Sequence, residues 1–515
     1  MKSAGFMARA DDLLNPIVVK ELRQAVKSRV VMAALLLFLF LQLTILLVIL
    51  LAGEYRSTQT VNLHAGRKTF EVLQGILLGT CMLLIPVYAG VRLAAEHSDT
   101  NVDLLFISTL RARAIIAGKF QASIVLILLI FSACAPFMTF TYLLRGIDIP
   151  SILMVLGMDF LAVLLGTQLA IFLGTVPANW GLKILLGLIG LGCLGVLFGT
   201  MMKGSLEMLE LGLGPLLGTL EFWLIAGAIV VAVVAVIGLL FAWSVAIVTP
   251  PSANRALPVR LYLLAAWLVT GGVAAYLTRR FVTPIPLYFW MDGFILLLCV
   301  QILTAINERD RWGLRVTRTI PRRWWLRGPA FLLYSGAAGG IGFALLLIAL
   351  TIGPPSYLLS LERDSFFHLS RGKIDVIDTN TLVMVLIILY TFNYSMTAVV
   401  LRNMLLPRRL KSLFTWLLAL LLGGLGCSLP FIFLFLFNNE GLRSGRINPW
   451  WYITNPAVTI YNIVMDWRSE VGEDFRTGVL WFLVVWAVLM ILLCLPWMGR
   501  QIGRFRPPER VDVVD

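Results

Sequence analysis

Twelve runs of about 20 apolar residues limit what this chain can fold into. Each run is long enough to cross the ~30 Å hydrocarbon layer of a bilayer as a single helix. The runs lie near residues 30–53, 71–92, 120–144, 151–175, 182–202, 219–249, 259–278, 285–306, 329–352, 381–401, 412–437 and 477–498. Only 14% of the 515 residues are charged, compared with about 25% in soluble domains. The sequence therefore predicts an all-α polytopic membrane protein with about 12 transmembrane helices.

A polar, proline-containing segment at residues 250–258 divides the runs into two sets of six. Each set has a long inner loop after its second run and an outer segment before its sixth run. This loop placement indicates two diverged six-helix halves, with two unrelated six-helix units as the alternative. The expected organisation is a basic amphipathic entry helix (1–29), a six-span module (30–249), a linker (250–258), a second six-span module (259–498) and a basic tail (499–515).

The net charge of +14 could suggest a nucleic-acid partner, but Lys and Arg cluster just outside the apolar runs. That placement is typical of topology signals, because short loops rich in Lys and Arg stay on the cytoplasmic side. The densest inner loop, residues 308–327, carries seven arginines. We therefore expect no nucleic acid, both termini in the cytoplasm, and an integral protein of a bacterial plasma (inner) membrane.

The segment before the first run, NPIVVKELRQAVKSR (15–29), has the pattern of a short helix. An asparagine can cap such a helix, and proline suits its first position. Val18 and Leu22 fall on one face at helical spacing, with basic residues on another. We expect this helix to lie in the headgroup layer; the alternative is a basic flank that only sets topology. The candidate interfacial residues are Asn15, Pro16, Lys20, Glu21, Arg23 and Lys27.

The inner loop EHSDTNVDLLFISTLRARAIIAGK (96–119) is too charged for a span and unusually apolar for a solvent-exposed loop. Its acidic residues come first, an aliphatic stretch follows at 104–107, and basic residues end it. Exposed aliphatic side chains on an inner loop need a partner, either lipid headgroups or another protein. The candidate residues are Glu96, Asp99, Asp103, Leu104, Leu105, Phe106, Arg111, Arg113 and Lys119.

This loop resembles the segment between the second and third spans of type 2 ABC transporter permeases. The positions that match in register are Glu96, Asp103, Leu104, Leu105, Leu110, Ile115, Gly118 and Lys119. His97, the pair Thr100-Asn101 and Thr109 depart from the family pattern. Residues 15–23 also resemble the family's entry helix, so the resemblance covers residues 15–250. It implies that residues 96–106 form a coupling helix seated on a separate ATPase subunit of an ABC exporter.

The chain itself is expected to have no catalytic role. A phosphate-binding loop requires Gly-x-x-x-x-Gly-Lys-Ser/Thr, whereas the Gly-Lys pairs at 117–120 and 371–374 continue with Phe and Ile. The three histidines lie in loops, and the six cysteines lack metal-ligand spacing. We expect no metal or cofactor here, with ATP bound by the partner subunit. Membrane lipids are the other expected partner, and both a homodimer and a self-contained twelve-span pore remain open.

Two carboxylates, Asp159 and Asp292, lie roughly mid-span, each followed nine residues later by Gln168 and Gln301 respectively. A carboxylate in a bilayer is costly and is by default a functional hypothesis. Nine residues place the two side chains on opposite faces of a helix, so each pair does not form one site. The alternative function is therefore a proton- or ion-coupled secondary carrier that uses Asp159 and Asp292; protonated or hydrogen-bonded structural carboxylates are the other interpretation.

Overall fold

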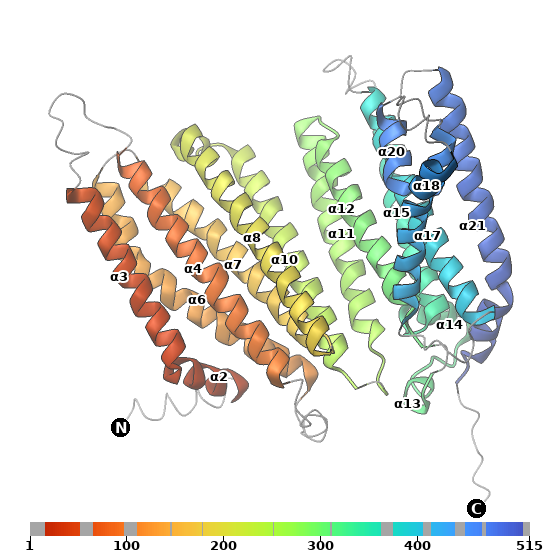
Figure 1. Cartoon of the computed structure of the whole chain (residues 1–515). Helices are drawn as coiled ribbons and strands as arrows, with labels where there is room; N and C mark the ends of the chain where they lie inside the picture. The colour runs from red at the N-terminus through yellow and green to blue at the C-terminus, as the bar shows by residue number, and fades with distance from the viewer. Residues whose placement is uncertain are drawn as a thin grey trace, which may run out of the picture. The chain divides into compact units, whose positions relative to one another are not determined.

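The structure is a computed structural model and describes residues 16–51, 65–96, 111–144, 147–177, 179–250, 252–309, 312–361, 374–404, 414–437, 449–465 and 470–507. No strand occurs among these described residues. Twelve of their helices are long and apolar enough to cross a membrane (Figure 1). The predicted all-α polytopic membrane fold with 12 transmembrane helices is therefore confirmed.

Two compact units divide the chain, Met1–Pro250 and Pro251–Asp515, and we call them unit 1 and unit 2. Each unit contains six of the twelve membrane-spanning helices. The boundary falls at the start of the polar segment that was expected to be a linker. That segment is shorter than expected, because the first helix of unit 2 already begins at Ala256.

Unit 1 adds two short helices to its six spans. The short helices are α2 (Pro16–Lys27) and α9 (Leu213–Leu216), and the spans are α3 (Arg29–Leu51), α4 (Ala65–Glu96), α6 (Ala112–Leu143), α7 (Ile149–Thr175), α8 (Trp180–Leu211) and α10 (Leu220–Val248). α10 is helical although it is rich in Val and Ile, which favour strands in water. In lipid every backbone polar group must be hydrogen-bonded within the protein, and a helix does this by itself. This requirement outweighs the strand preference of Val and Ile.

The core of unit 1 is built around α4. Its buried side chains Phe70, Leu73 and Leu77 pack with those of α3, α6 and α7, including Ile127 of α6 and Val163 of α7. α4 therefore contacts most of the unit. Because the core is closely packed, a displacement of either end of α4 would also displace the helices packed against it.

α4 and α7 approach each other closely through small residues. A Cβ built on Gly90 would lie 2.8 Å from the carbonyl oxygen of Ala170, and one built on Gly174 would lie 2.6 Å from the carbonyl oxygen of Gly90. Small residues allow such backbone contact between helices in membranes, where packing drives association. Any side chain larger than hydrogen at Gly90 or Gly174 would push the two helices apart.

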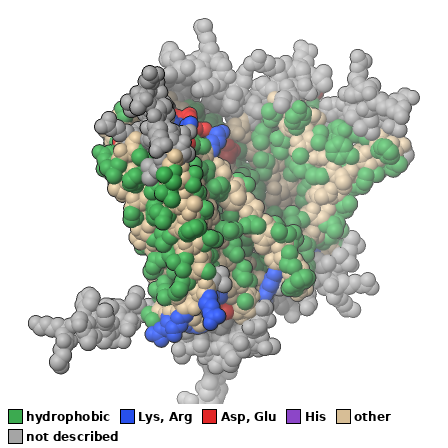
Figure 2. Space-filling view, turned by 60° about the vertical axis from the view of Figure 1, so that its left-hand side comes forward, with side chains coloured by type: hydrophobic (Ala, Val, Ile, Leu, Met, Phe, Trp, Pro, Cys, Tyr) green, Lys and Arg blue, Asp and Glu red, His purple; other side chains and the backbone are tan. Residues whose placement is uncertain are grey.

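The surface of α8 and α10 is largely apolar. α8 and α10 expose Leu188, Val196, Trp223 and Val234 among other large hydrophobic side chains. Figure 2 shows many hydrophobic side chains on the face that it presents, with Lys and Arg gathered toward the ends of that face. An apolar belt with charged ends is what a bilayer with polar headgroups requires.

Unit 2 also has six spans, with further short helices between them. The spans are α11 (Ala256–Phe281), α12 (Ile285–Ala305), α15 (Ala337–Leu361), α17 (Ile374–Met404), α18 (Thr415–Phe437) and α21 (Glu470–Arg504), and the short elements are α13 (Leu314–Thr317), α14 (Trp324–Leu333), a 3-10 helix (Pro449–Tyr452) and α20 (Pro456–Met465). α17 and α21 are joined by Asn393 Nδ2, which donates to the Leu483 carbonyl oxygen at 2.9 Å, and by Trp486 Nε1, which donates to Thr397 Oγ1 at 3.2 Å.

Several helices extend beyond the predicted spans, and three of them show the effect clearly. α6 begins at Ala112 rather than near residue 120, α8 continues to Leu211, and α21 continues to Arg504, into the predicted basic tail. Hydropathy marks the part of a helix that is in hydrocarbon, whereas the helix itself continues into the headgroup layer as long as its polar side chains are satisfied.

Candidate functional site

Four charged side chains from three helices meet at one end of unit 1. Lys119 of α6 places its Nζ 2.9 Å from Oε1 of Glu21 in α2. The same Nζ lies 2.8 Å from Oε2 of Glu96, the last residue of α4. Arg92 of α4 completes the group, with its Nε 3.5 Å from Glu21 Oε2. We call these four residues the ion cluster.

The centre of the ion cluster is buried. The side chains of Lys119 and Glu21 are 6% and 8% exposed, whereas those of Arg92 and Glu96 are 26% and 35% exposed. A buried charge without a partner is strongly destabilising, whereas a well-paired one fixes geometry more than it adds net stability. The cluster therefore specifies how α2, α4 and α6 meet.

Arg92 is oriented by the preceding turn of α4. Its Nη1 donates to the Tyr88 hydroxyl, and its Cζ lies 5.6 Å from the centre of the Tyr88 ring. A guanidinium over an aromatic face is attracted to the ring electrons. The sequence did not single out Arg92, because an arginine at the end of an apolar run is the ordinary topology signal.

The entry helix is present in the structure as α2, and one face of it packs against the rest of unit 1. Val18, Glu21 and Ala25 are buried, while Lys20, Arg23 and Lys27 are exposed. Glu21 was predicted to be an interfacial residue, but it lies on the buried face in contact with Lys119. Its spacing of three residues from Val18 and four from Ala25 is the signal that could have placed it there. The predicted cap Asn15 lies outside the described residues, which begin with Pro16 at the helix start.

The predicted coupling loop is described only at its two ends. Glu96 ends α4 and Arg111 precedes α6; Asp99, Asp103, Leu104, Leu105 and Phe106 lie outside the described residues. Arg113 is exposed in the first turn of α6. Lys119 was expected in the loop, but it is buried two turns inside α6, because Glu21 and Glu96 satisfy its charge. The chain therefore leaves α4 at Glu96 of the ion cluster and enters α6 after Arg111, eight residues before Lys119.

Unit 2 has a buried ion pair at the corresponding end of its second span. Arg260 of α11 is fully buried, and its Nη2 lies 2.5 Å from Oε1 of Glu308, just after α12. Its Nη1 donates to the carbonyl oxygens of Leu332 and Tyr334. The other carboxylate oxygen of Glu308 accepts from the Gly336 N–H. Burial raises the pKa of Glu308, while Arg260 and the Gly336 N–H oppose that shift.

The two intramembrane carboxylates have neutral partners from neighbouring helices. Asp159 of α7 is buried and accepts from Nε2 of Gln74 in α4 at 2.9 Å. Gln168, nine residues later, donates to Ser244 of α10 at 3.5 Å. In unit 2, Asn380 Nδ2 lies 3.4 Å from Asp292 Oδ2. The Asp159 contact joins the two helices that also meet at Gly90, which suits a structural carboxylate between helices.

Comparison with protein-family models, with curated proteins and with solved structures found no match to this chain. The part of the chain that the structure describes contains no group of three or more His, Cys, Asp or Glu side chains that could hold a metal ion. The ion cluster and the helices that it joins are therefore the candidate functional site of unit 1.

Proposed function

We propose that this multi-pass membrane protein is the membrane-spanning permease subunit of an ATP-driven ABC-type transporter, an exporter, coupled to a separate ATPase subunit through the inner loop 96–119. The observation that carries this proposal is the ion cluster. It connects both ends of that loop to the entry helix and to the core of unit 1.

Force applied to the loop would reach the spans through short, stiff connections. Glu96 ends α4 and Arg111 begins the entry into α6, so the loop pulls directly on two core helices. Lys119 then ties both helices to α2 through Glu21. Because α4 contacts α7 backbone to backbone at Gly90 and Gly174, a tilt of α4 would carry α7 with it. ATP-driven closure of the partner would in this way open a path between spans.

Replacing Leu104 and Leu105 of the loop with aspartate is expected to abolish binding of the ATPase. The test is co-purification of an ATPase encoded by a neighbouring gene with wild type and with the double variant Leu104→Asp/Leu105→Asp. Burying two carboxylates in an apolar groove is costly, so the double variant should retain a small fraction of the bound ATPase at most. Leu216→Asp, in α9 at the opposite end of unit 1, is the matched control and should bind normally. Equal recovery with wild type and the double variant would disprove the docking.

A second candidate function is a proton- or ion-coupled carrier, favoured by the buried position of Asp159. The variant Asp159→Asn distinguishes the ATP-driven permease from the ion-coupled carrier. Its amide oxygen can still accept from Gln74, so an ATP-driven complex should keep its ATP hydrolysis rate and its melting temperature. A carrier would instead lose proton release into vesicles that contain a pH-sensitive dye. Loss of that dye signal in Asp159→Asn, with no ATPase bound, would replace the first proposal by the second.

A further inference from the structure

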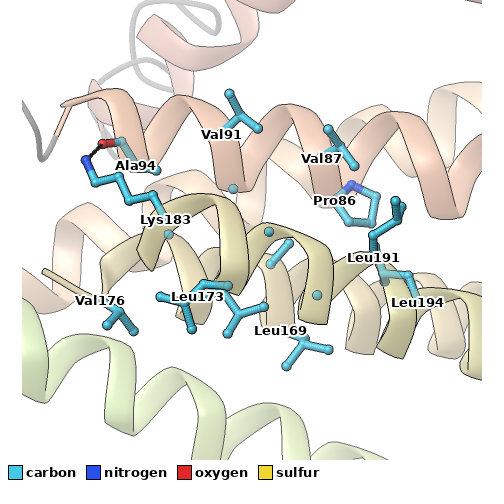
Figure 3. A pocket seen from close by; sticks show the side chains of 16 residues that line it. Pro86, Val87, Val91, Ala94, Leu169, Leu173, Val176, Lys183, Leu191 and Leu194 are labelled. Carbon is cyan, nitrogen blue, oxygen red and sulfur yellow. Dashed lines mark hydrogen bonds between the residues drawn. The ribbon is translucent and has the colours of Figure 1, made fainter. Parts of the chain in front are cut away.

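Unit 1 has an apolar groove between α4, α7 and α8 that the coupling proposal does not use. Its volume is about 160 Å³, and its lining is aliphatic side chains and glycines with Lys183 at one end (Figure 3). Among the described residues that line it, Lys183 carries the only charge. We propose that this groove binds one acyl chain of an anionic phospholipid from the inner leaflet, with the lipid phosphate at Lys183.

The groove results from a proline and from missing side chains. Pro86 lies inside α4, where its ring removes a backbone hydrogen bond and loosens the helix. On α8, a Cβ built on Gly187 would meet nothing within 4 Å. A Cβ on Gly190 would lie 2.7 Å from Leu173 Cδ1 of α7, so α8 rests on α7 there. The space beside Gly187 is therefore open, whereas at Gly190 the helices α7 and α8 are in direct contact.

The charged end of the groove has the chemistry of a phosphate site. Lys183 Nζ donates to the carbonyl oxygen of Ala94 in α4 at 2.9 Å, as Figure 3 shows. An ammonium has three N–H groups and that bond uses one of them. Ala94 is two residues before Glu96, so Lys183 lies near the end of α4 where the ion cluster is found. A compact, strongly solvated ammonium is a common partner of phosphate.

The length of the groove matches one leaflet. Lys183 and Leu194 both line it, and their separation of eleven positions corresponds to a rise of roughly 16 Å along α8. Half of a ~30 Å hydrocarbon layer has about that thickness. Trp180, three residues before Lys183, is 81% exposed, and a tryptophan there is typical of the headgroup level. An acyl chain in the groove would therefore reach from the inner headgroups to the bilayer centre.

The test uses the full-length protein in lipid nanodiscs, without an ATPase. A phosphatidylglycerol probe with a photoreactive acyl chain is compared with the corresponding phosphatidylcholine probe, and labelled peptides of α4 and α8 are quantified by mass spectrometry. Wild type should be labelled more by the anionic probe. Gly187→Leu would fill the groove and exclude roughly two methylenes, so labelling should fall about tenfold.

Two further variants separate the chain site from the headgroup site. Gly195→Leu is the matched control, because Gly195 is also an open position of α8 but does not line the groove; it should be labelled as wild type is. Lys183→Met should lower labelling by the anionic probe to the level of the neutral probe and leave the neutral probe unchanged.

Undiminished labelling of Gly187→Leu would overturn the proposal, as would absence of label from α4 and α8 in wild type, which would mean that protein covers the groove. An equal loss of both probes in Lys183→Met would overturn the phosphate assignment. Because the assay contains no ATPase, its failure would leave the proposed coupling function standing.

Discussion

Replacing Lys119 with Met is expected to destabilise unit 1 by about 3 kcal/mol and to release α2 from its surface. The substitution keeps most of the length of the side chain but leaves Glu21, which is 8% exposed, without its nearest positive charge. Arg92 remains at 3.5 Å from Glu21, a longer contact to the other carboxylate oxygen. Val18 and Ala25 are the other buried side chains of α2 that would still hold it.

Two measurements check the Lys119 prediction. Unfolding in mixed detergent micelles gives the free energy of unfolding, and hydrogen exchange of the peptide covering Pro16–Lys27 reports release of α2. Lys27→Met is the matched control, because it removes the same charge from an exposed position of α2. The double variant Glu21→Gln/Lys119→Met should recover part of the loss, since no unpaired buried carboxylate remains. Unchanged exchange in α2 would show that the cluster does not hold this helix.

Replacing Arg260 with Met is expected to destabilise unit 2 by about 3–5 kcal/mol. The guanidinium is fully buried and serves three acceptors, the Glu308 carboxylate and the carbonyl oxygens of Leu332 and Tyr334. Its loss would leave the mostly buried Glu308 carboxylate with the Gly336 N–H as its partner among the described residues, and would leave two carbonyl oxygens without this donor. The chain around α14 would then separate from α11.

The Arg260 prediction is measured as thermal unfolding in detergent, together with proteolysis between α12 and α15. Arg280→Met, an exposed arginine of the same helix, should leave both unchanged. Arg260→Lys should recover only part of the stability, because one ammonium cannot reproduce the planar fork of a guanidinium. A melting temperature of Arg260→Met equal to that of Arg280→Met would contradict the structural role.

The number and class of the membrane helices were predictable because hydrocarbon thickness imposes a length on each apolar run. The ends of the helices were not. α6 begins eight residues before the predicted span, since Lys119 is paired inside the protein, and hydropathy treats any lysine as a solvent-facing residue.

Three of the four residues of the ion cluster were singled out from the sequence, but their contacts with one another were not predicted. Glu21, Glu96 and Lys119 had been assigned to two separate features, an interfacial helix and a coupling loop. Their contacts join residues 98 positions apart in the chain, and no local pattern reports such a separation. The apolar groove was also missed, because it depends on glycines that have no side chain to give a signal and on how α8 lies over α7.

The ion cluster contains two acids and two bases, so its formal charges cancel. Moving one elementary charge through the membrane field costs about 2.3 kcal/mol per 100 mV, whereas a neutral group that moves as one body displaces no net charge. The four side chains of the ion cluster, moving as one body while still paired, would therefore contribute no net charge displacement. The membrane potential would neither drive nor oppose the movement of the ion cluster itself.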